Sequence, residues 1–217
     1  MRRREFITIP ARSLGGVLVY TLAREPYRIQ AQDGSVRIAL RFFSEAEAKV
    51  VSAAAERIFP SDANGPGATE AGVVIYIDRQ LAGPYGRDQY RYTKAPWAES
   101  LPEHGYQGKA TPREIYRSAI AQLEGLPSLT AAQQDAKLHS IETTLFFQML
   151  RRHTLEGMFC DPHHGGNANM IGWQLIGYPG PRMSYRDEIG PNPDPPKRKP
   201  VSLAEMAGRP VKGWEDE

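Results

Sequence analysis

The most specific part of this chain reads Glu156-Gly-Met-Phe-Cys-Asp-Pro-His-His-Gly-Gly-Asn167, and Gly172-Trp-Gln-Leu-Ile-Gly-Tyr-Pro-Gly180 follows shortly after it. Gly, Pro and Asn are frequent here, and these residue types specify unusual backbone conformations position by position. The block holds no complete catalytic or cofactor signature. We interpret it as a rigid loop that closes the domain, as a docking surface for a partner, or as both. The docking residues are Asp161, Pro162, His163, His164, Gly165, Gly166, Asn167, Trp173, Gly177, Pro179 and Gly180.

Individual residues of this block have separate expected roles. Asp161 before Pro162 is typical of a turn in which the carboxylate accepts a hydrogen bond from nearby backbone. Gly165-Gly166 allows positive φ or a close backbone approach, and Asn167 tolerates positive φ or caps the following segment. Trp173, with Ile176 and Tyr178, offers apolar area to a core or to an interface.

Helix start and stop signals predict a mainly α protein. Ser44-Glu-Ala-Glu47 is a capping box, and Phe59-Pro60 ends the helix that it opens. The same reasoning predicts further helices from Thr69 to Leu81, from the Thr111 cap to Gly125, from the Thr130 cap to Glu142, and after the Thr144 cap through Met158. Residues 36–43 are predicted as a short strand or a lead-in. The aromatic stretch 83–109 is predicted as an ordered excursion that packs on the domain or on another protein.

The chain divides into three predicted parts. Residues 24–186 form a single compact helical domain with long ordered loops. Residues 187–217 are rich in Pro and charge, which favours an extended arm. A formal net charge of +2 argues against a nucleic-acid partner. No apolar run has the ~20 residues that a membrane span requires.

The first part, residues 1–23, resembles an export signal. Arg3, Arg4 and Phe6 form a twin-arginine pattern, and a mildly apolar segment ends in Thr21-Leu22-Ala23, small residues of the kind that signal peptidase reads. Such a signal directs folded proteins through the twin-arginine translocase to the periplasm. The alternative is a basic N-terminus on a short helix.

The sequence excludes several cofactor sites in this chain. A dinucleotide site of the common kind would show Gly-x-Gly-x-x-Gly, which is absent. Covalent haem and cysteine-ligated iron–sulfur clusters need more than the single cysteine present. His153, Cys160, Asp161, His163 and His164 are the one cluster of potential metal ligands, but Pro162 and the tight spacing disfavour convergence on one ion. We therefore assign no catalytic, cofactor-binding or metal residue.

Cys160 nevertheless supports an alternative function. Paired with His153 or His163, its thiol could act as the nucleophile of an exported thiol enzyme, or as a ligand in a metal-dependent one. In an oxidising compartment a lone cysteine also suggests an intermolecular disulfide or a free thiol. The plainest interpretation is a small buried side chain.

Several of these motifs together resemble the gluconate 2-dehydrogenase subunit 3 family, which contains the small subunits of membrane-bound, FAD-dependent sugar and sugar-acid dehydrogenases. The resemblance covers roughly Phe43 to Pro181. It rests on Phe146-Phe147, Thr154 to Asn167, Gly172-Trp173, Ile176 to Gly180, Phe43 to Glu47, Ile58 to Asp62 and Gly65 to Val73.

The resemblance implies a non-catalytic subunit that supplies the export signal and assists maturation of its partner. The implied partner is a large flavoprotein of the glucose-methanol-choline type that carries FAD, often with an iron–sulfur cluster. A membrane-bound multihaem cytochrome c is the implied third subunit. The complex would lie in the periplasm, on the outer face of the cytoplasmic membrane. A lone periplasmic binding or scaffold protein is a further alternative.

Within this family an inter-subunit disulfide becomes plausible for Cys160. The resemblance implies a bond to a cysteine of the large subunit, with the loop from Asp161 to Gly166 fixing its orientation.

Overall fold

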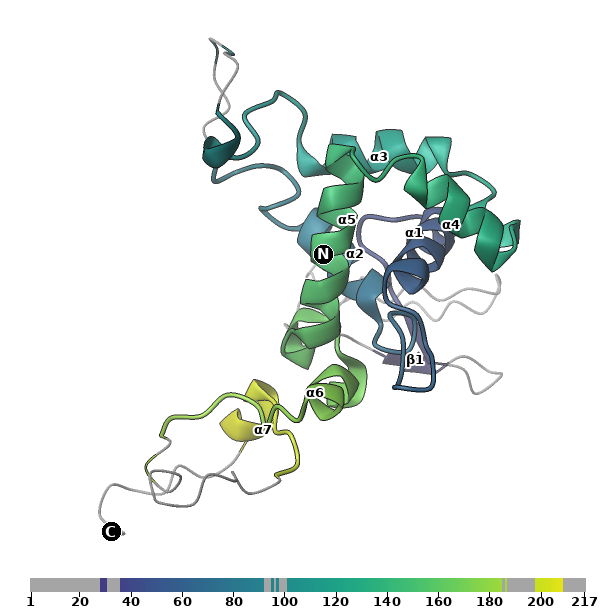
Figure 1. Cartoon of the computed structure of the whole chain (residues 1–217). Helices are drawn as coiled ribbons and strands as arrows, with labels where there is room; N and C mark the ends of the chain where they lie inside the picture. Colours follow the sequence, from purple (N-terminus) through teal and green to yellow (C-terminus); the bar gives the residue numbers. More distant parts are fainter. Residues whose placement is uncertain are drawn as a thin grey trace, which may run out of the picture. The chain divides into compact units, whose positions relative to one another are not determined.

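A computed structural model describes residues 28–30, 36–91, 95, 97, 101–184, 186 and 198–208 (Figure 1). Two units are distinguished, Met1–Arg41 and Phe42–Glu217. The described part of the first unit consists of strands β1 (Arg28–Gln30) and β2 (Val36–Ile38), which pair antiparallel. The strand alternative for the start of 36–43 is thus confirmed. The predicted export signal, 1–23, lies outside the described residues.

The second unit is mainly helical, as predicted. Helix α1 (Glu45–Ile58) begins at the Ser44 capping box, and the Glu47 carboxylate accepts a hydrogen bond from the Ser44 amide at 2.8 Å. The other helices are α2 (Val73–Ala82), α3 (Pro112–Gln122), α4 (Ala131–His139), α5 (Leu145–Phe159), α6 (Ile171–Ile176) and α7 (Leu203–Ala207). Short 3-10 turns, η2 (Pro102–His104), η3 (Leu126–Ser128), η4 (Pro162–His164) and η5 (Ala168–Met170), connect them. Among the described residues, no helix is long and apolar enough to span a membrane.

Helix α2 begins four residues later than predicted. Gly72 has a φ of 70°, a left-handed conformation that interrupts a right-handed helix. The amide of Val73 instead donates to the carbonyl of Ala68, so 69–72 form turns. Helix α4 likewise ends at His139, before the predicted Glu142.

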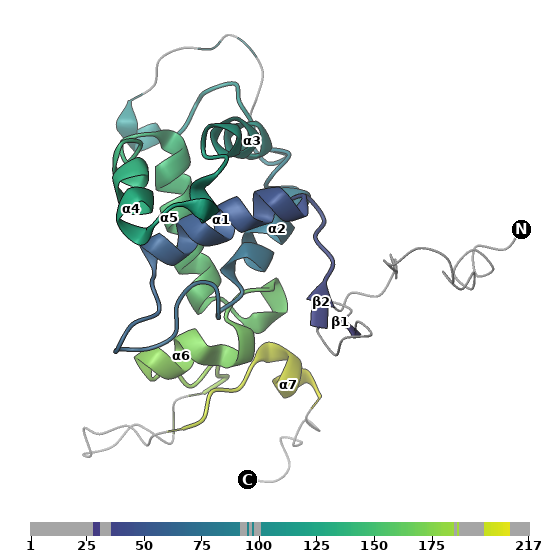
Figure 2. The ribbon, with the colours of Figure 1, turned by 90° about the vertical axis from the view of Figure 1, so that its right-hand side faces the viewer.

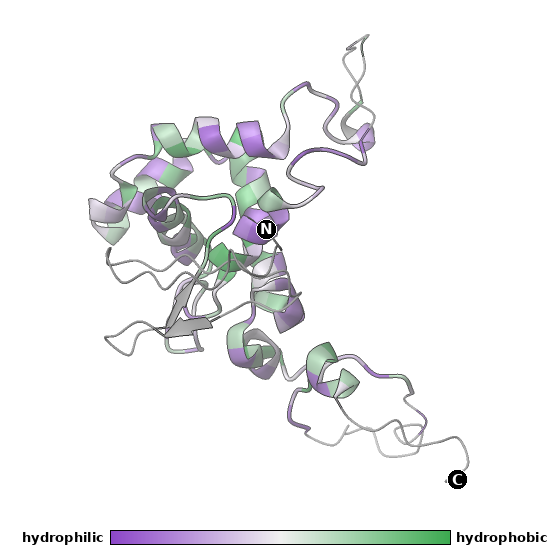
Figure 3. Ribbon diagram, turned by 180° about the vertical axis from the view of Figure 1, so that it is seen from behind, coloured by the Kyte–Doolittle hydropathy of each residue, from purple (hydrophilic) through white to green (hydrophobic). Residues whose placement is uncertain are grey.

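Helix α5 is the centre of the fold. It packs against α1, α2, α3 and α6 (Figures 1 and 2). Figure 3 shows hydrophobic and hydrophilic bands on the helices, the pattern of amphipathic helices around a shared core. Among the described residues, the largest fully buried side chain is that of Tyr116 on α3.

Buried polar groups join the helices. The Asp78 carboxylate on α2 accepts hydrogen bonds from the amides of Phe42 and Phe43, both at 2.9 Å, and so fixes the chain that enters α1. The Arg113 guanidinium on α3 donates to the carbonyls of Leu81 and Ala82 at the end of α2, where carbonyls lack helical partners.

A second polar chain crosses the core. The Tyr116 hydroxyl lies 2.8 Å from Nδ1 of His153, and the Tyr85 hydroxyl lies 3.0 Å from Nε2 of the same ring. The ring of His153 stacks on Tyr116, with centroids 5.7 Å apart. Because both ring nitrogens have phenol partners, His153 is positioned as a structural member of the core.

The predicted C-terminal arm is not extended throughout its described part. Within 198–208, the sequence Ser202-Leu-Ala-Glu205 forms a capping box that opens α7. The Val201 amide donates to the carbonyl of Pro179 at 3.2 Å, which attaches this segment to the helical unit. Of the excursion 83–109, the described residues form turns and η2.

Acidification from pH 7 to pH 5 is expected to lower the free energy of unfolding by about 2 kcal/mol through His153. Burial, and secondarily Arg152, lowers the pKa of His153 from 6.5 to about 4. In this interval the unfolded chain takes up a proton that the folded chain excludes, so the stability present at neutral pH is lost as pH falls towards 4. The other four histidines are exposed. Urea denaturation across this range measures the effect.

The matched variant is His153→Gln, which should unfold with much weaker pH dependence. If this variant does not fold, NMR titration of the His153 ring protons in the unchanged protein gives the same answer. A ring that titrates near pH 6.5 would contradict the expectation.

Candidate docking site around Cys160

The block after α5 turns sharply because its backbone takes unusual conformations. Asn167, Asn169 and Met170 have φ values of 47°, 55° and 59°. Such values are uncommon for residues with a side chain, and they are least unfavourable for Asn. The turn therefore needs compensating hydrogen bonds, and it brings α6 back against the end of α5.

Asn167 provides most of that compensation. Its side chain is fully buried, its Nδ2 donates to the Cys160 carbonyl at 2.8 Å, and its Oδ1 accepts from the Gly172 amide at 2.8 Å. Its own amide donates to the Gly157 carbonyl at 2.8 Å. One residue thus joins the last turn of α5 to the first turn of α6. The expected positive φ of Asn167 is confirmed, whereas its side chain does not cap η5, the segment that directly follows it.

Gly157 and Gly166 are required because other atoms pack too closely against them for a side chain to fit. A Cβ added to Gly166 would lie 2.2 Å from the Gly157 carbonyl oxygen, which real Cβ atoms do not tolerate. A Cβ on Gly157 would press on Val73 and Tyr76 at 3.2 and 3.3 Å, at the contact between α5 and α2.

Asp161 holds two segments at once. Its Oδ1 accepts from the His163 amide at 3.0 Å, which confirms the expected turn at Asp161-Pro162. Its Oδ2 accepts from the Leu203 amide at 2.8 Å, at the start of α7. Figures 1 and 2 show α7 next to α6, near the end of α5. The sequence interpretation missed this attachment, although the capping box at Ser202 was a readable signal for a helix.

Trp173 belongs to the core, whereas its neighbours are exposed. Its side chain is 3% exposed and Nε1 donates to the Phe159 carbonyl at 2.7 Å. By contrast, 58% of Ile176 and 37% of both Leu175 and Tyr178 is exposed. Of the apolar residues expected to serve a core or an interface, the structure places Trp173 inside and Ile176 and Tyr178 outside.

The remaining predicted docking residues complete this arrangement. Gly177, with a φ of 68°, ends α6. Pro179 and Gly180 carry the chain past Val201, whose backbone lies where a Gly180 side chain would be. Pro162 begins η4, and Gly165, with a φ of 104°, is the residue that caps its end.

His163 and His164 lie exposed, with ring centroids 5.0 Å apart. Among the described residues, no group of three or more His, Cys, Asp or Glu side chains is arranged to hold a metal ion.

The structure engages His153, one of the two bases proposed in the enzyme alternative, with other partners. Both ring nitrogens of His153 are engaged by Tyr116 and Tyr85. The Cys160 thiol is half-buried and donates to the Gly157 carbonyl at a sulfur–oxygen distance of 3.6 Å. Burial raises the pKa of Cys160 to about 11, and the Asp161 carboxylate adds to this rise. The thiol is therefore protonated at neutral pH, which disfavours nucleophilic catalysis.

Gly166→Ala is expected to lower the free energy of unfolding by at least ~2 kcal/mol, because the methyl group meets the backbone of Gly157. Gly177→Ala is the matched control: nothing lies within 4 Å of its Cβ, so only positive φ opposes it, at a cost of about 1 kcal/mol. Denaturant unfolding of both variants compares them. Equal losses would show that α6 does not depend on this close approach.

Comparison with known proteins agrees with these features. A family model described as gluconate 2-dehydrogenase subunit 3 matches residues 45–180, which is more than half of the chain and runs from α1 to the end of the docking block. No curated protein and no solved structure gives a significant match. This chain belongs to the gluconate 2-dehydrogenase subunit 3 family.

Proposed function

We propose that this chain is the non-catalytic small subunit of a periplasmic, FAD-dependent sugar or sugar-acid dehydrogenase complex. The family match over 45–180 carries this proposal, because the family name describes a subunit of a dehydrogenase. In the proposed complex the chain provides twin-arginine export and stabilises the maturing catalytic flavoprotein.

The chemistry of the proposed complex lies in the other subunits. The large glucose-methanol-choline-type flavoprotein holds FAD and, in some complexes, an iron–sulfur cluster. A membrane-bound multihaem cytochrome c receives the electrons and attaches the complex to the outer face of the cytoplasmic membrane. Arg3, Arg4 and Phe6 support export by the twin-arginine translocase, which carries folded proteins and thus suits a flavin-loaded partner.

The exposed apolar side chains at the end of α6 and just after it support docking at this end of the unit. Leu175, Ile176 and Tyr178 follow one another within four positions and remain accessible to solvent. The ring of Tyr178 rests on the buried ring of Trp173, with centroids 5.1 Å apart. An apolar surface on a rigid base loses little conformational entropy when a partner covers it.

Cys160 would join this surface covalently. Two thiols, Cys160 and one of the large subunit, each lose a proton and together pass two electrons to a disulfide-bearing oxidoreductase of the periplasm. The high pKa of Cys160 keeps the thiol protonated before docking, which limits premature oxidation. We expect docking to precede the bond.

Without reductant, the small subunit of the purified complex should migrate in denaturing gels with the large subunit, and with reductant it should migrate alone. Cys160→Ser should remove the shift while the native complex persists, because the remaining contacts are noncovalent. Migration of the unchanged small subunit by itself without reductant would rule out the disulfide.

Ile176→Glu should reduce the flavoprotein recovered with a tagged small subunit by about tenfold or more, because a carboxylate would be desolvated in an apolar interface. Co-expression with the proposed large flavoprotein subunit, followed by periplasmic extraction, measures recovery and dehydrogenase activity. Without the small subunit, active flavoprotein should be missing from the periplasm.

Ala132→Glu on α4 is the matched control, since it places the same carboxylate at another exposed helical position. It should leave recovery unchanged. Full periplasmic activity in the absence of the small subunit would contradict the proposed function, whereas equal recovery with both variants would contradict only the assignment of the α6 surface.

A further inference from the structure

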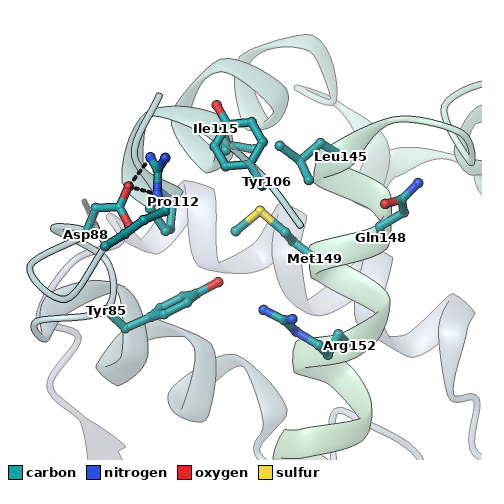
Figure 4. Close-up of a pocket in the computed structure, with 10 residues that line it drawn as sticks. Tyr85, Asp88, Tyr106, Pro112, Ile115, Leu145, Gln148, Met149 and Arg152 are labelled. Atoms are coloured by element: carbon teal, nitrogen blue, oxygen red, sulfur yellow. Dashed lines mark hydrogen bonds and ion pairs between the residues drawn. The ribbon is translucent and has the colours of Figure 1, made fainter. Parts of the chain in front are cut away.

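A second site lies at the opposite end of α5 from Cys160. A pocket of about 460 Å³ opens between the start of α3, the first half of α5 and the excursion after α2 (Figure 4). This volume falls in the range of small-molecule sites, roughly 300–1,000 Å³. The α5 residues of the lining lie between eight positions (Arg152) and fifteen positions (Leu145) before Cys160, about 12 to 22 Å along a helix, so the pocket is distinct from the docking residues around Cys160.

The pocket has an apolar floor. Pro112 and Met149 are buried, and Ile115 and Leu145 are half-buried beside them. Polar groups surround this floor, from Tyr85, Asp88, Arg91, Tyr106, Gln148 and Arg152. Such a lining suits a ligand with one apolar part and one polar part.

The charges in the lining favour an anion. Arg91 is neutralised by Asp88, to which its Nε donates at 2.8 Å, and its guanidinium lies 5.1 Å from the centre of the Tyr106 ring. Arg152 interacts with the Tyr85 hydroxyl. It also forms a long ion pair with Glu156, at 3.6 Å between Nε and Oε1, in which both side chains are exposed. An exposed pair of this kind is weak, so the Arg152 guanidinium remains able to bind a carboxylate.

Hydrogen bonds in the core determine whether the Tyr85 hydroxyl is free to donate its hydrogen into the pocket. Tyr116 is fully buried, and its hydroxyl bonds to Nδ1 of His153. If Nδ1 carried the hydrogen, the Tyr116 O–H would be buried without an acceptor, which is costly. We therefore assign Tyr116 as the donor to Nδ1, and the N–H of neutral His153 to Nε2.

The same assignment continues to Tyr85. The Nε2–H of His153 donates to the Tyr85 oxygen at 3.0 Å, so the Tyr85 O–H must point elsewhere. Figure 4 shows the Tyr85 hydroxyl directed towards Arg152, within the pocket. Burial raises the pKa of Tyr85, so the phenol keeps this hydrogen. Two donors, one neutral and one charged, therefore serve the same side of the cavity.

We propose that this pocket binds a small carboxylate with an apolar body, whose carboxylate accepts hydrogen bonds from Tyr85 and Arg152 while its body covers Met149. The proposal does not depend on the docking surface or on catalysis in another subunit. Tyr116 and His153 act as positioning residues, because they hold the Tyr85 oxygen as an acceptor and leave its O–H for the ligand.

Calorimetric titration with 2-naphthoate tests this site. The protein is titrated in the complex in which it is isolated. Binding should be saturable, and the uncharged 2-naphthamide should bind at least about tenfold more weakly. Arg152→Gln should raise the dissociation constant for 2-naphthoate about tenfold or more, and Tyr85→Phe about threefold or more. Leu145→Trp, which fills the pocket, should abolish binding.

Arg151→Gln is the matched control, because it removes the same charge from the neighbouring exposed position, which does not line the pocket. Its dissociation constant should stay within about twofold of the unchanged protein, a difference too small for a lost charge-assisted bond. Circular dichroism verifies that each variant is folded. The proposal is overturned if binding of 2-naphthoate does not saturate. A pocket that is already filled by a partner's side chain would give this result and would equally overturn the proposal. It is also overturned if the amide binds equally well, or if Arg151→Gln and Arg152→Gln weaken binding alike.

Discussion

The hydrogen bonding of the buried Asn167 amide is the interaction on which the proposed docking surface depends. It satisfies the Cys160 carbonyl and the Gly172 amide, two groups at helix ends that would otherwise be left without partners. The amide side chain of Asn167 carries both a donor and an acceptor, and so it serves both groups. The strained backbone at 167–170 exists because this hydrogen bonding, together with the close approach of Gly166 to α5, stabilises it.

This constraint links local sequence to the proposed assembly. With the turn fixed, Trp173 is directed into the core and Ile176 is left on the surface. Asp161 adds a second attachment by capping the start of α7, so the C-terminal segment supports the same region. The block is therefore rigid before any partner arrives, and the proposed interface needs little ordering when it forms.

Local signals in the sequence predicted much of the fold. The capping box at Ser44 and the helix starts at Thr111 and Thr130 are confirmed, because such signals depend on residues only three positions apart. The burial of Tyr116 and the pairing of His153 with two tyrosines were not predictable, since they depend on contacts between α3, α5 and the excursion that no local pattern encodes. For the same reason, the composition of residues 156–180 could not show that Trp173 is buried in the core while Tyr178 is exposed.

The central claim is that the block from Cys160 to Gly180 is the surface by which this subunit binds its dehydrogenase partner. Hydrogen–deuterium exchange of the small subunit, measured in the native complex and after release from it, tests this most directly. The account predicts that complex formation slows exchange at 171–178 and in the turn after Cys160, while α4 exchanges equally in both states. Slowed exchange on α4 with no change at 171–178 would contradict it.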